Sequence, residues 1–285
     1  MSNHSSLTYG KQERTTHRAI DNALNSARNR QKVMDKRGRI KCSDYELAAV
    51  SLNGRLKWEK ALRLELGRHL GLMPNANITS NDVFWFCFVD VNCLQRCHYQ
   101  YGASFKPLKC INSYRKGLKG LSYVAMLEPA IYASSSRIKP PAFEHLGQFE
   151  KTISWHCHGL AWGESRKEMR LRFNEIEARG IYVPAVPNLK GCWAKFIQPE
   201  LISQKIGYMC KTPRLTNRVY CRNPDKFDEE KWEFEQEEMK SRPGEHILYF
   251  KLLAPYTLDQ LTFAGGDGSK ILQTVKAPFV SRTKA

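Results

Sequence analysis

Two histidines separated by a single residue are the part of this sequence best suited to do chemistry. His156 and His158 lie in the apolar and aromatic stretch 153–162. Because successive side chains of a β-strand point to opposite faces, a strand here places both imidazoles on one face and Cys157 on the other. Imidazole is a frequent metal ligand, so the pair would form half of a metal site. A purely structural role for the histidines is the alternative that the motif alone leaves open.

An oxygen ligand would complete such a site, and two glutamates are candidates for it. Glu128 stands at the end of the apolar stretch 121–128, which predicts a strand that ends at Pro129. Consecutive strands joined by a loop usually pair antiparallel, so Glu128 would approach the histidines. Glu150, shortly before the histidine strand, is the alternative. An oxygen ligand in the set favours Mg²⁺ or Mn²⁺.

A tyrosine and a lysine one helical turn apart are candidates for a nucleophile and its neighbouring cation. The segment 200–210 is predicted to be a helix, with Pro199 where a helix can begin. At helical spacing Tyr208 and Lys211 share a stripe that differs from the apolar one. The residues expected to face the core are Ile202, Ile206 and Met209.

The elements that must hold these residues indicate an α+β fold with a central antiparallel sheet and helices on its faces. The stretch 83–92 is apolar at almost every position, which is typical of a central strand covered on both sides. A charged amphipathic helix is expected at 164–179. Beyond the sheet, the sequence predicts an exposed acidic helix at 228–238 and a strand at 247–253.

Three segments are expected along the chain. Residues 1–78 are read as a basic helical extension, with helices at 14–34 and 44–72 and an interruption at Gly54. A turn-rich break precedes the central segment 79–213, which carries the candidate site. Residues 214–285 are read as a C-terminal appendage of unknown role with a fraying end.

The charge balance points to a polyanionic partner. Lys and Arg outnumber Asp and Glu by 45 to 28, which gives the 285-residue chain a formal net charge of +17. Such an excess costs self-repulsion and favours nucleic acid as the partner over an anionic membrane surface. Without an apolar run of about 18 residues or an apolar leader, the chain is expected to have no membrane partner and to be cytoplasmic.

The cysteines fit the same compartment. Nine cysteines without a Cys-x-x-Cys pair favour reduced thiols. One group of potential zinc ligands stands out, but buried free thiols are the preferred interpretation because its spacing fits no zinc-finger pattern. Its members are Cys93, Cys97, His98 and Cys110.

Taken in order, these motifs resemble the HUH endonuclease superfamily, and specifically its rolling-circle replication initiators. The matching residues are 84–92 for the apolar strand, 156–158 for His-hydrophobic-His, and 208–211 for Tyr-x-x-Lys. In initiators the tyrosine follows the histidines, as it does here. The resemblance covers residues 81–213 and makes the central segment a nickase domain with a ferredoxin- or RRM-like core. A second tyrosine one turn away is absent, because that place holds Gln204, so a single-tyrosine enzyme is implied.

The resemblance implies metal-dependent, site-specific nicking and religation of single-stranded DNA at a plasmid or phage origin or hairpin. Tyr208 would form a 5′-phosphotyrosine, with Lys211 stabilising charge, and host helicase and polymerase would act with the protein. Candidate DNA-binding residues are Lys205, Arg214, Lys106 and Arg115. The alternatives are a transposase with the same chemistry and a non-catalytic nucleic-acid-binding protein whose histidines are structural or bind zinc.

Overall fold

A computed structural model describes residues 47–70, 82–90, 94–96, 108–134, 138–140, 143, 151–213, 215–222 and 232–280. The helices are α2 (Leu52–His69), α3 (Leu108–Gly117), α4 (Arg166–Ala178), α5 (Pro199–Cys210), α6 (Pro243–Leu253), α7 (Leu258–Leu261) and α8 (Asp267–Val280). The strands are β1 (Val83–Phe88), β2 (Leu94–Arg96), β3 (Ser122–Ala133), β4 (Lys151–Trp162), β5 (Cys192–Ile197), β6 (Leu215–Cys221), β7 (Phe234–Lys240) and β8 (Thr262–Gly265). The α+β class is confirmed.

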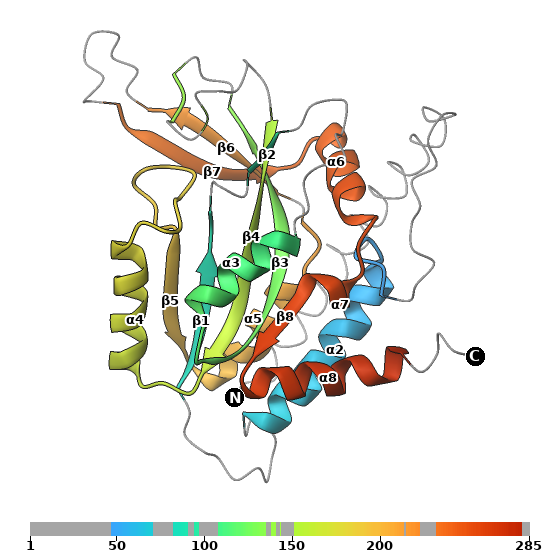
Figure 1. Ribbon diagram of the computed structural model, residues 1–285. Coiled ribbons are helices and arrows are strands. Elements are labelled where there is room, and N and C mark those ends of the chain that lie inside the picture. The colour runs from blue at the N-terminus through green and yellow to red at the C-terminus, as the bar shows by residue number, and fades with distance from the viewer. Residues whose placement is uncertain are drawn as a thin grey trace, which may run out of the picture.

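One curled sheet organises the molecule (Figure 1). Its strands follow the order β5-β1-β4-β3-β6-β7, with β2 paired to β4 and β8 paired to β3. Every pairing among these strands is antiparallel except that of β3 with β6, which is parallel. The sheet is therefore mixed, and its antiparallel part holds the histidine strand at the centre.

The pair β3–β4 is the longest ladder of the sheet and fixes the register of the site. It runs from Ser122 opposite Trp162 to Ala133 opposite Lys151. Pro129 does not end β3, contrary to the expectation from the sequence. On the side of β3 away from β4, β8 pairs only up to Met126 and β6 begins only at Ile131, so the proline falls in the gap between them. A missing N–H removes no ladder bond at such a place.

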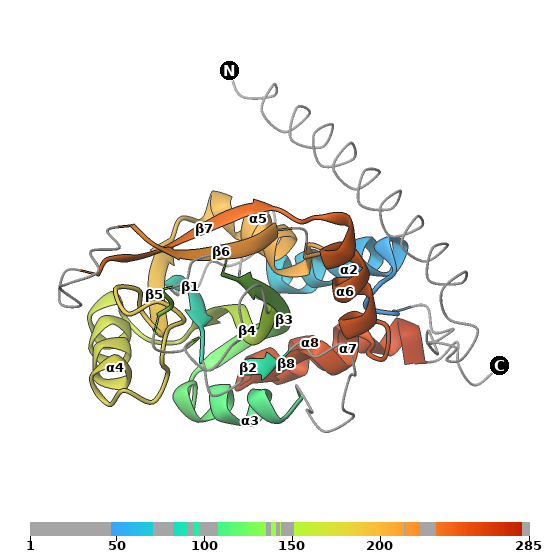
Figure 2. The ribbon, with the colours of Figure 1, turned by 90° about the horizontal axis from the view of Figure 1, so that it is seen from above.

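Helices cover both faces of the sheet (Figure 2). On one face, Phe173 of α4 packs against Phe88 of β1, and Tyr114 of α3 donates a 2.5 Å hydrogen bond to the carbonyl oxygen of Trp155. On the other face α5 lies over β3 and β4, with α2 beside it. Side chains of β4 therefore alternate between an α3 face, which includes Cys157, and an α5 face, which includes both histidines.

Several elements differ from those expected. Residues 192–197, for which the sequence predicts no element, form the strand β5, and residues 234–238, expected to be part of an acidic helix, belong to β7. The reverse happens at 247–253, where the predicted strand is part of the helix α6. The edge strand β7 is mostly exposed and so shows little apolar pattern, whereas α6 is buried along most of its length, and a continuous apolar run does not reveal its period.

The N-terminal prediction is corrected in its bounds. Of the helix expected at 44–72, the structure has α2, which begins at Leu52 and runs through Gly54 without interruption. The side chain of Ser51 caps it by accepting a hydrogen bond from the Gly54 N–H. The basic helix predicted at 14–34 lies outside the described residues.

The C-terminal segment is built into the same fold. Residues after 214 contribute β6, β7 and β8 to the sheet, and the end expected to fray forms α8 up to Val280. Phe279 of α8 packs on Trp58 of α2, with ring centroids 5.8 Å apart. Among the described residues, no helix combines the length and the apolar character needed to cross a bilayer.

Candidate metal centre and nucleophile

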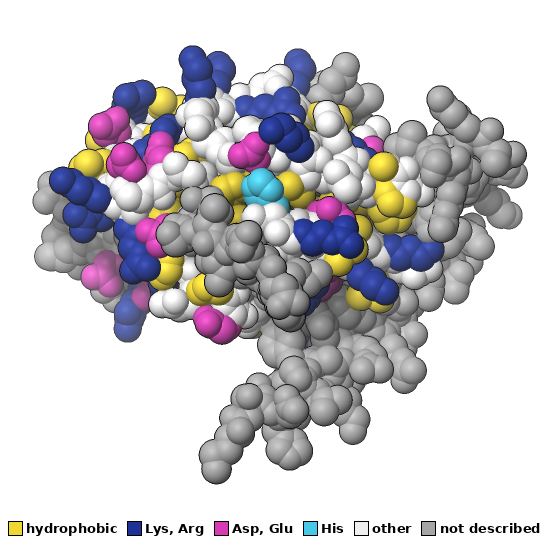
Figure 3. All heavy atoms as spheres, turned by 90° about the horizontal axis from the view of Figure 1, so that it is seen from below, with side chains coloured by type: hydrophobic (Ala, Val, Ile, Leu, Met, Phe, Trp, Pro, Cys, Tyr) yellow, Lys and Arg dark blue, Asp and Glu magenta, His cyan; other side chains and the backbone are white. Residues whose placement is uncertain are grey.

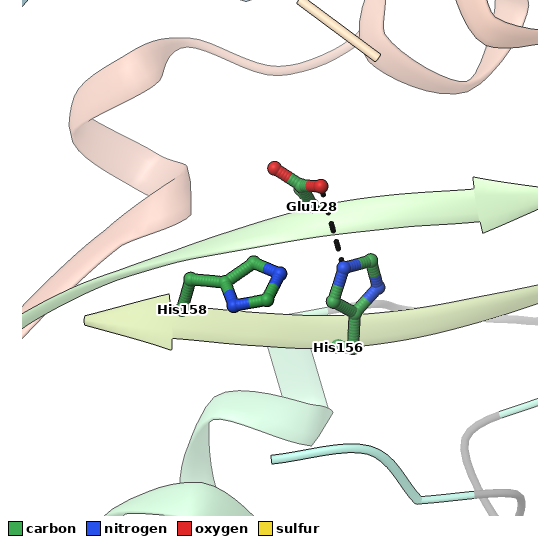
Figure 4. Close-up of side chains that lie close together, drawn as sticks. All are labelled: Glu128, His156 and His158. Carbon is green, nitrogen blue, oxygen red and sulfur yellow. Dashed lines mark ion pairs between the residues drawn. The ribbon is translucent and has the colours of Figure 1, made fainter. Parts of the chain in front are cut away.

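Three potential ligand side chains converge on the α5 face of the sheet (Figure 4). Glu128 of β3 is the cross-strand partner of His156 of β4, and its Oε1 lies 3.3 Å from His156 Nε2. His158 follows on the same face. One ligand atom from each of the three residues lies within 4.8 Å of the others, and all three side chains are buried. The predicted approach of Glu128 to the histidines is thus confirmed, whereas the alternative Glu150 lies outside the described residues.

The cluster is held in a charge state suited to a cation. Burial raises the pKa of Glu128, but Lys211 and the hydrogen bond with His156 outweigh it and lower that pKa to about 2. Burial, together with His156, lowers the pKa of His158 to about 3. An ionised carboxylate and a neutral imidazole are the forms that bind divalent metals.

The donor atoms of the cluster show whether these residues fit an ion. One ligand atom of each residue lies within 4.8 Å of the other two, and His156 turns Nε2 toward Glu128 Oε1. Nδ1 of both histidines is buried without a hydrogen-bond partner among the described residues. The donor set of two imidazoles and one carboxylate, with no thiolate in the cluster, suits a divalent metal ion.

Tyr208 stands directly against this cluster. Its ring meets the ring of His158 edge-on, with centroids 5.3 Å apart and planes at 86°. Trp85 of β1 stacks on the other side of His158 at 5.3 Å with planes 6° apart, and also meets Tyr208 edge-on at 5.7 Å. The tyrosine side chain remains 38% exposed, so its hydroxyl can reach a ligand from solvent.

Lys211 lies beside the tyrosine, although not by the helical spacing expected. The helix α5 ends at Cys210, and Lys211 is its C-cap with an extended backbone (φ −57°, ψ 150°). From there Nζ sits 3.5 Å from the centre of the Tyr208 ring. Burial raises the pKa of Tyr208, and the lysine opposes that rise. Lys211 is thus the cation nearest to the candidate nucleophile among the described residues.

No family model, curated protein or solved structure matches this chain. The chemistry of the site therefore has to be argued from its own residues.

The predicted DNA-binding residues fall in different places. Lys205 of α5 lies at the site, with Nζ 5.4 Å from the centre of the Trp85 ring. Arg115 lies on α3, on the opposite face of the sheet, so the structure does not bring it to the cluster. Lys106 and Arg214 lie outside the described residues. On the face seen in Figure 3, Lys and Arg side chains are interspersed with Asp and Glu and form no continuous stripe.

The zinc interpretation of the cysteines gains no support from the part of the chain that is described. Cys110 is a buried residue of α3 with a free thiol. The remaining members of that group, Cys93, Cys97 and His98, lie outside the described residues. Tyr220 is also excluded from the candidate centre, because its hydroxyl donates to Glu235 Oε2 at 3.0 Å between β6 and β7.

Sequence reasoning missed two residues that hold the site. The sequence predicts Trp85 only as one residue of a buried strand. In a continuous apolar run, no feature indicates which ring packs against a histidine. Arg55 of α2 is buried, and its Nη1 donates to the carbonyl oxygens of Cys210 (3.0 Å) and Lys211 (2.8 Å). It thereby satisfies carbonyls that the end of α5 leaves without helical partners. A lone arginine in a basic segment gives no signal of this contact.

A cavity of about 430 Å³ opens beside the cluster. Glu128, His156, His158, Tyr208 and Lys211 line one end of it. The other end is bounded by the segment 184–190 and by the hairpin β6–β7. A volume of this size falls within the range of about 300–1,000 Å³ that is usual for small-ligand pockets.

Proposed function

We propose that this protein is a single-tyrosine HUH-type replication initiator that nicks and rejoins single-stranded DNA. The observation that carries the proposal is the contact of Tyr208 with a buried Glu-His-His cluster. A tyrosine against a candidate metal centre, with a lysine over its ring, has the parts of a phosphoryl-transfer site. The net charge of +17 supports a polyanionic substrate.

The reaction exchanges one phosphate ester for another. The phenolic oxygen of Tyr208 forms a bond to phosphorus while the bond from phosphorus to the 3′ oxygen breaks. The phenol gives up its proton and the leaving 3′ oxygen gains one. Tyr208 then carries the 5′ end of the downstream strand, and the free 3′-OH can prime synthesis or reverse the reaction to rejoin the strand.

Residues of this chain account for the charge that develops. Lys211 stabilises the phenolate of Tyr208 and opposes the effect of burial, which favours the neutral phenol. Glu128, His156 and His158 would hold the divalent ion. Mg²⁺ or Mn²⁺ bound there would supply Lewis-acid stabilisation of the phosphate oxygens. Trp85 keeps the His158 imidazole and the tyrosine ring in a fixed relation.

The decisive experiment is a test for the covalent adduct and its polarity. The protein is incubated with Mn²⁺ and a pool of random-sequence single-stranded oligonucleotides labelled at the 3′ end or at the 5′ end. A 5′-phosphotyrosine predicts label on the protein only with the 3′-labelled pool, because the downstream fragment stays attached. EDTA should abolish it.

Two variants decide whether Tyr208 is responsible. Tyr208→Phe should remove the adduct, and Tyr220→Phe, the matched control on β6, should keep it. No adduct with Mg²⁺ or Mn²⁺ would reject the proposal in favour of a non-catalytic nucleic-acid-binding protein. An adduct that survives Tyr208→Phe would reject this residue as the nucleophile.

A further inference from the structure

The cavity extends along β3 well past the candidate metal centre. Ala130 and Tyr132 share the α5 face of β3 with Glu128 and also line the cavity. At a rise of about 3.3 Å per residue, Tyr132 lies about 13 Å along the strand from Glu128. If a phosphate of the ligand binds at the cluster, the far end of the cavity can hold a second group of the same ligand.

The hairpin β6–β7 presents polar side chains to this far end by strict alternation. On β6, Asn217 lines the cavity, whereas its neighbours Thr216 and Arg218 point away and contact Glu245. On β7, Gln236 and Glu238 line the cavity. The residues between and beside them alternate to the other face, as Glu235 shows by pairing with Tyr220.

The two amides are fixed to one another. Gln236 Nε2 donates a 2.8 Å hydrogen bond to Asn217 Oδ1, and Asn217 is buried. Apart from this bond, Asn217 can donate hydrogen bonds through Nδ2, and Gln236 can accept them through Oε1. A donor and an acceptor on two amides joined by a hydrogen bond can match a flat ligand that offers an acceptor beside a donor. Trp193 supplies an apolar surface in the same cavity.

Glu238 adds a second acceptor to this wall. An ionised carboxylate only accepts hydrogen bonds, so it favours an amino group and disfavours a carbonyl oxygen. Adenine and cytosine each carry an amino group beside a ring nitrogen that accepts. Thymine would place a carbonyl oxygen against the carboxylate, and guanine would place an N–H against the donor of Asn217.

We infer that Asn217, Gln236 and Glu238 form a base-reading pocket that selects adenine or cytosine in the single strand, at a nucleotide close to the scissile phosphate. The inference rests on the proposed function, since it takes the cluster to hold that phosphate. It assigns a binding role to β6–β7, a part of the chain outside the HUH resemblance. The two amides form hydrogen bonds with the edge of the base, and the wall of the cavity packs against the face of the base.

A binding selection tests the pocket without cleavage. Tyr208→Phe protein in EDTA is used to select single strands from a random pool, which are then sequenced. One position should be enriched in adenine or cytosine, and replacing that base by thymine should weaken binding roughly tenfold. Adding Gln236→Ala should reduce this discrimination to about twofold or less. Glu237→Gln, on the neighbouring residue of the opposite face, should leave it unchanged.

The outcomes separate the pocket from the strand-transfer chemistry. Base selection that Gln236→Ala removes, in a protein whose wild type forms no covalent adduct, would keep the pocket and reject the nickase. An adduct-forming protein without preference at any position, or with a preference that Gln236→Ala and Glu238→Gln leave intact, would reject the pocket. Melting temperatures check that each variant is folded, and Gln236 lies on β7, an edge strand of the sheet.

Discussion

At the scale of single residues, the candidate metal centre lowers the stability of the fold. Two buried ring nitrogens, Nδ1 of His156 and Nδ1 of His158, have no partner among the described residues. A buried polar atom left unpaired costs about 1–3 kcal/mol. Glu128 is ionised and buried beside them. Residues that are kept for stability alone would not be arranged in this way, and an ion bound to the cluster would offset part of the cost.

The first prediction follows from this cost. Mn²⁺ should raise the melting temperature of the wild type, because a ligand at 100 times its Kd stabilises the folded state by about 2.7 kcal/mol. His158→Ala should lose most of this shift, while His69→Ala, at an exposed histidine of α2, should keep it. Differential scanning calorimetry with and without Mn²⁺ measures the effect. Equal shifts in all three proteins would place the metal elsewhere.

How much of the site the sequence predicts depends on the range of the contacts. Glu128 could be found because consecutive strands pair and alternate by simple rules. Tyr208 and Lys211 could be found as a pair, and the end of the helix at Cys210 was predicted, but the contact of Arg55 with this end could not be, because Arg55 comes from a distant segment. The contact of Trp85 with His158 could not be predicted, because every residue of its strand is apolar. The pairwise contacts of buried rings are decided by packing, which periodicity does not encode.

At the scale of elements, α2 is hydrogen-bonded to the end of α5, the helix that carries Tyr208. The Arg55 guanidinium is buried, and its partners include the carbonyl oxygens of Ala49, Cys210 and Lys211. Burial lowers the pKa of Arg55 to about 10, so the side chain stays charged at neutral pH. A charged donor on three carbonyls ties the segment before α2 to the turn after α5.

Replacing Arg55 should therefore affect both stability and chemistry. Arg55→Met leaves buried carbonyls unpaired and should lower the free energy of unfolding by about 2–3 kcal/mol. It should also reduce the yield of the covalent adduct, because Lys211 loses its backbone anchor. Arg68→Met, in the last turn of the same helix, should change neither, since Arg68 is exposed and pairs only locally with Glu65. Urea titration and the adduct assay provide the two measurements.

A second link joins α6 to the sheet through one carboxylate. Glu245 is fully buried and pairs with Lys151 of β4 at 3.0 Å and Arg218 of β6 at 2.9 Å. Burial raises its pKa, but the Arg242 N–H, Lys151 and Arg218 outweigh burial and lower it. A carboxylate whose pKa is lowered in the folded state stabilises the fold above its unfolded pKa, about 4.3, and loses this contribution as pH falls below that value.

The pH dependence of stability should report this link. The wild type should lose stability as the pH falls below about 4.3. Glu245→Gln should be less stable at pH 7, by about 3 kcal/mol, because it leaves buried cations without their carboxylate. Its stability should also fall less steeply on acidification. Urea titrations at several pH values test both, and parallel curves for the two proteins would contradict the assignment.

The elements themselves could be predicted unevenly. Strands β1, β3 and β4 and helices α4 and α5 follow from apolar patterns and caps. The hairpin β6–β7 and the helix α6 could not be assigned correctly, because their character depends on what they pack against. In β7, the acidic residue Glu235 pairs with Arg222, which directly follows β6.

At the scale of the whole molecule, the site depends on segments from both ends of the described chain. The strand that carries Glu128 is flanked by β6 and β8, both of which follow Tyr208 and Lys211 in sequence. The helix that carries Tyr208 packs on α2, which precedes them, and α2 in turn packs on α8. Elements from before and after the central segment therefore pack around β3.

A chain limited to residues 79–213 should therefore not fold stably. It would lack α2, α8 and the strands that border β3, and it would expose the apolar residues that these elements cover. Circular dichroism and thermal unfolding should show a cooperative transition for residues 47–280 and none for 79–213. A cooperative transition in the shorter chain would show that the central segment is an independent domain.

The register of β3 against β4 has one more consequence. Because Glu128 and His156 are cross-strand partners, a slip of β4 by one residue would turn both histidines toward α3 and bring Cys157 to the glutamate. A misfolded molecule with this slip would look similar by secondary-structure content but would have lost its ligand set. Metal stoichiometry, titrated against total protein, should then count the correctly folded fraction of a preparation and serve as a quality standard for refolding.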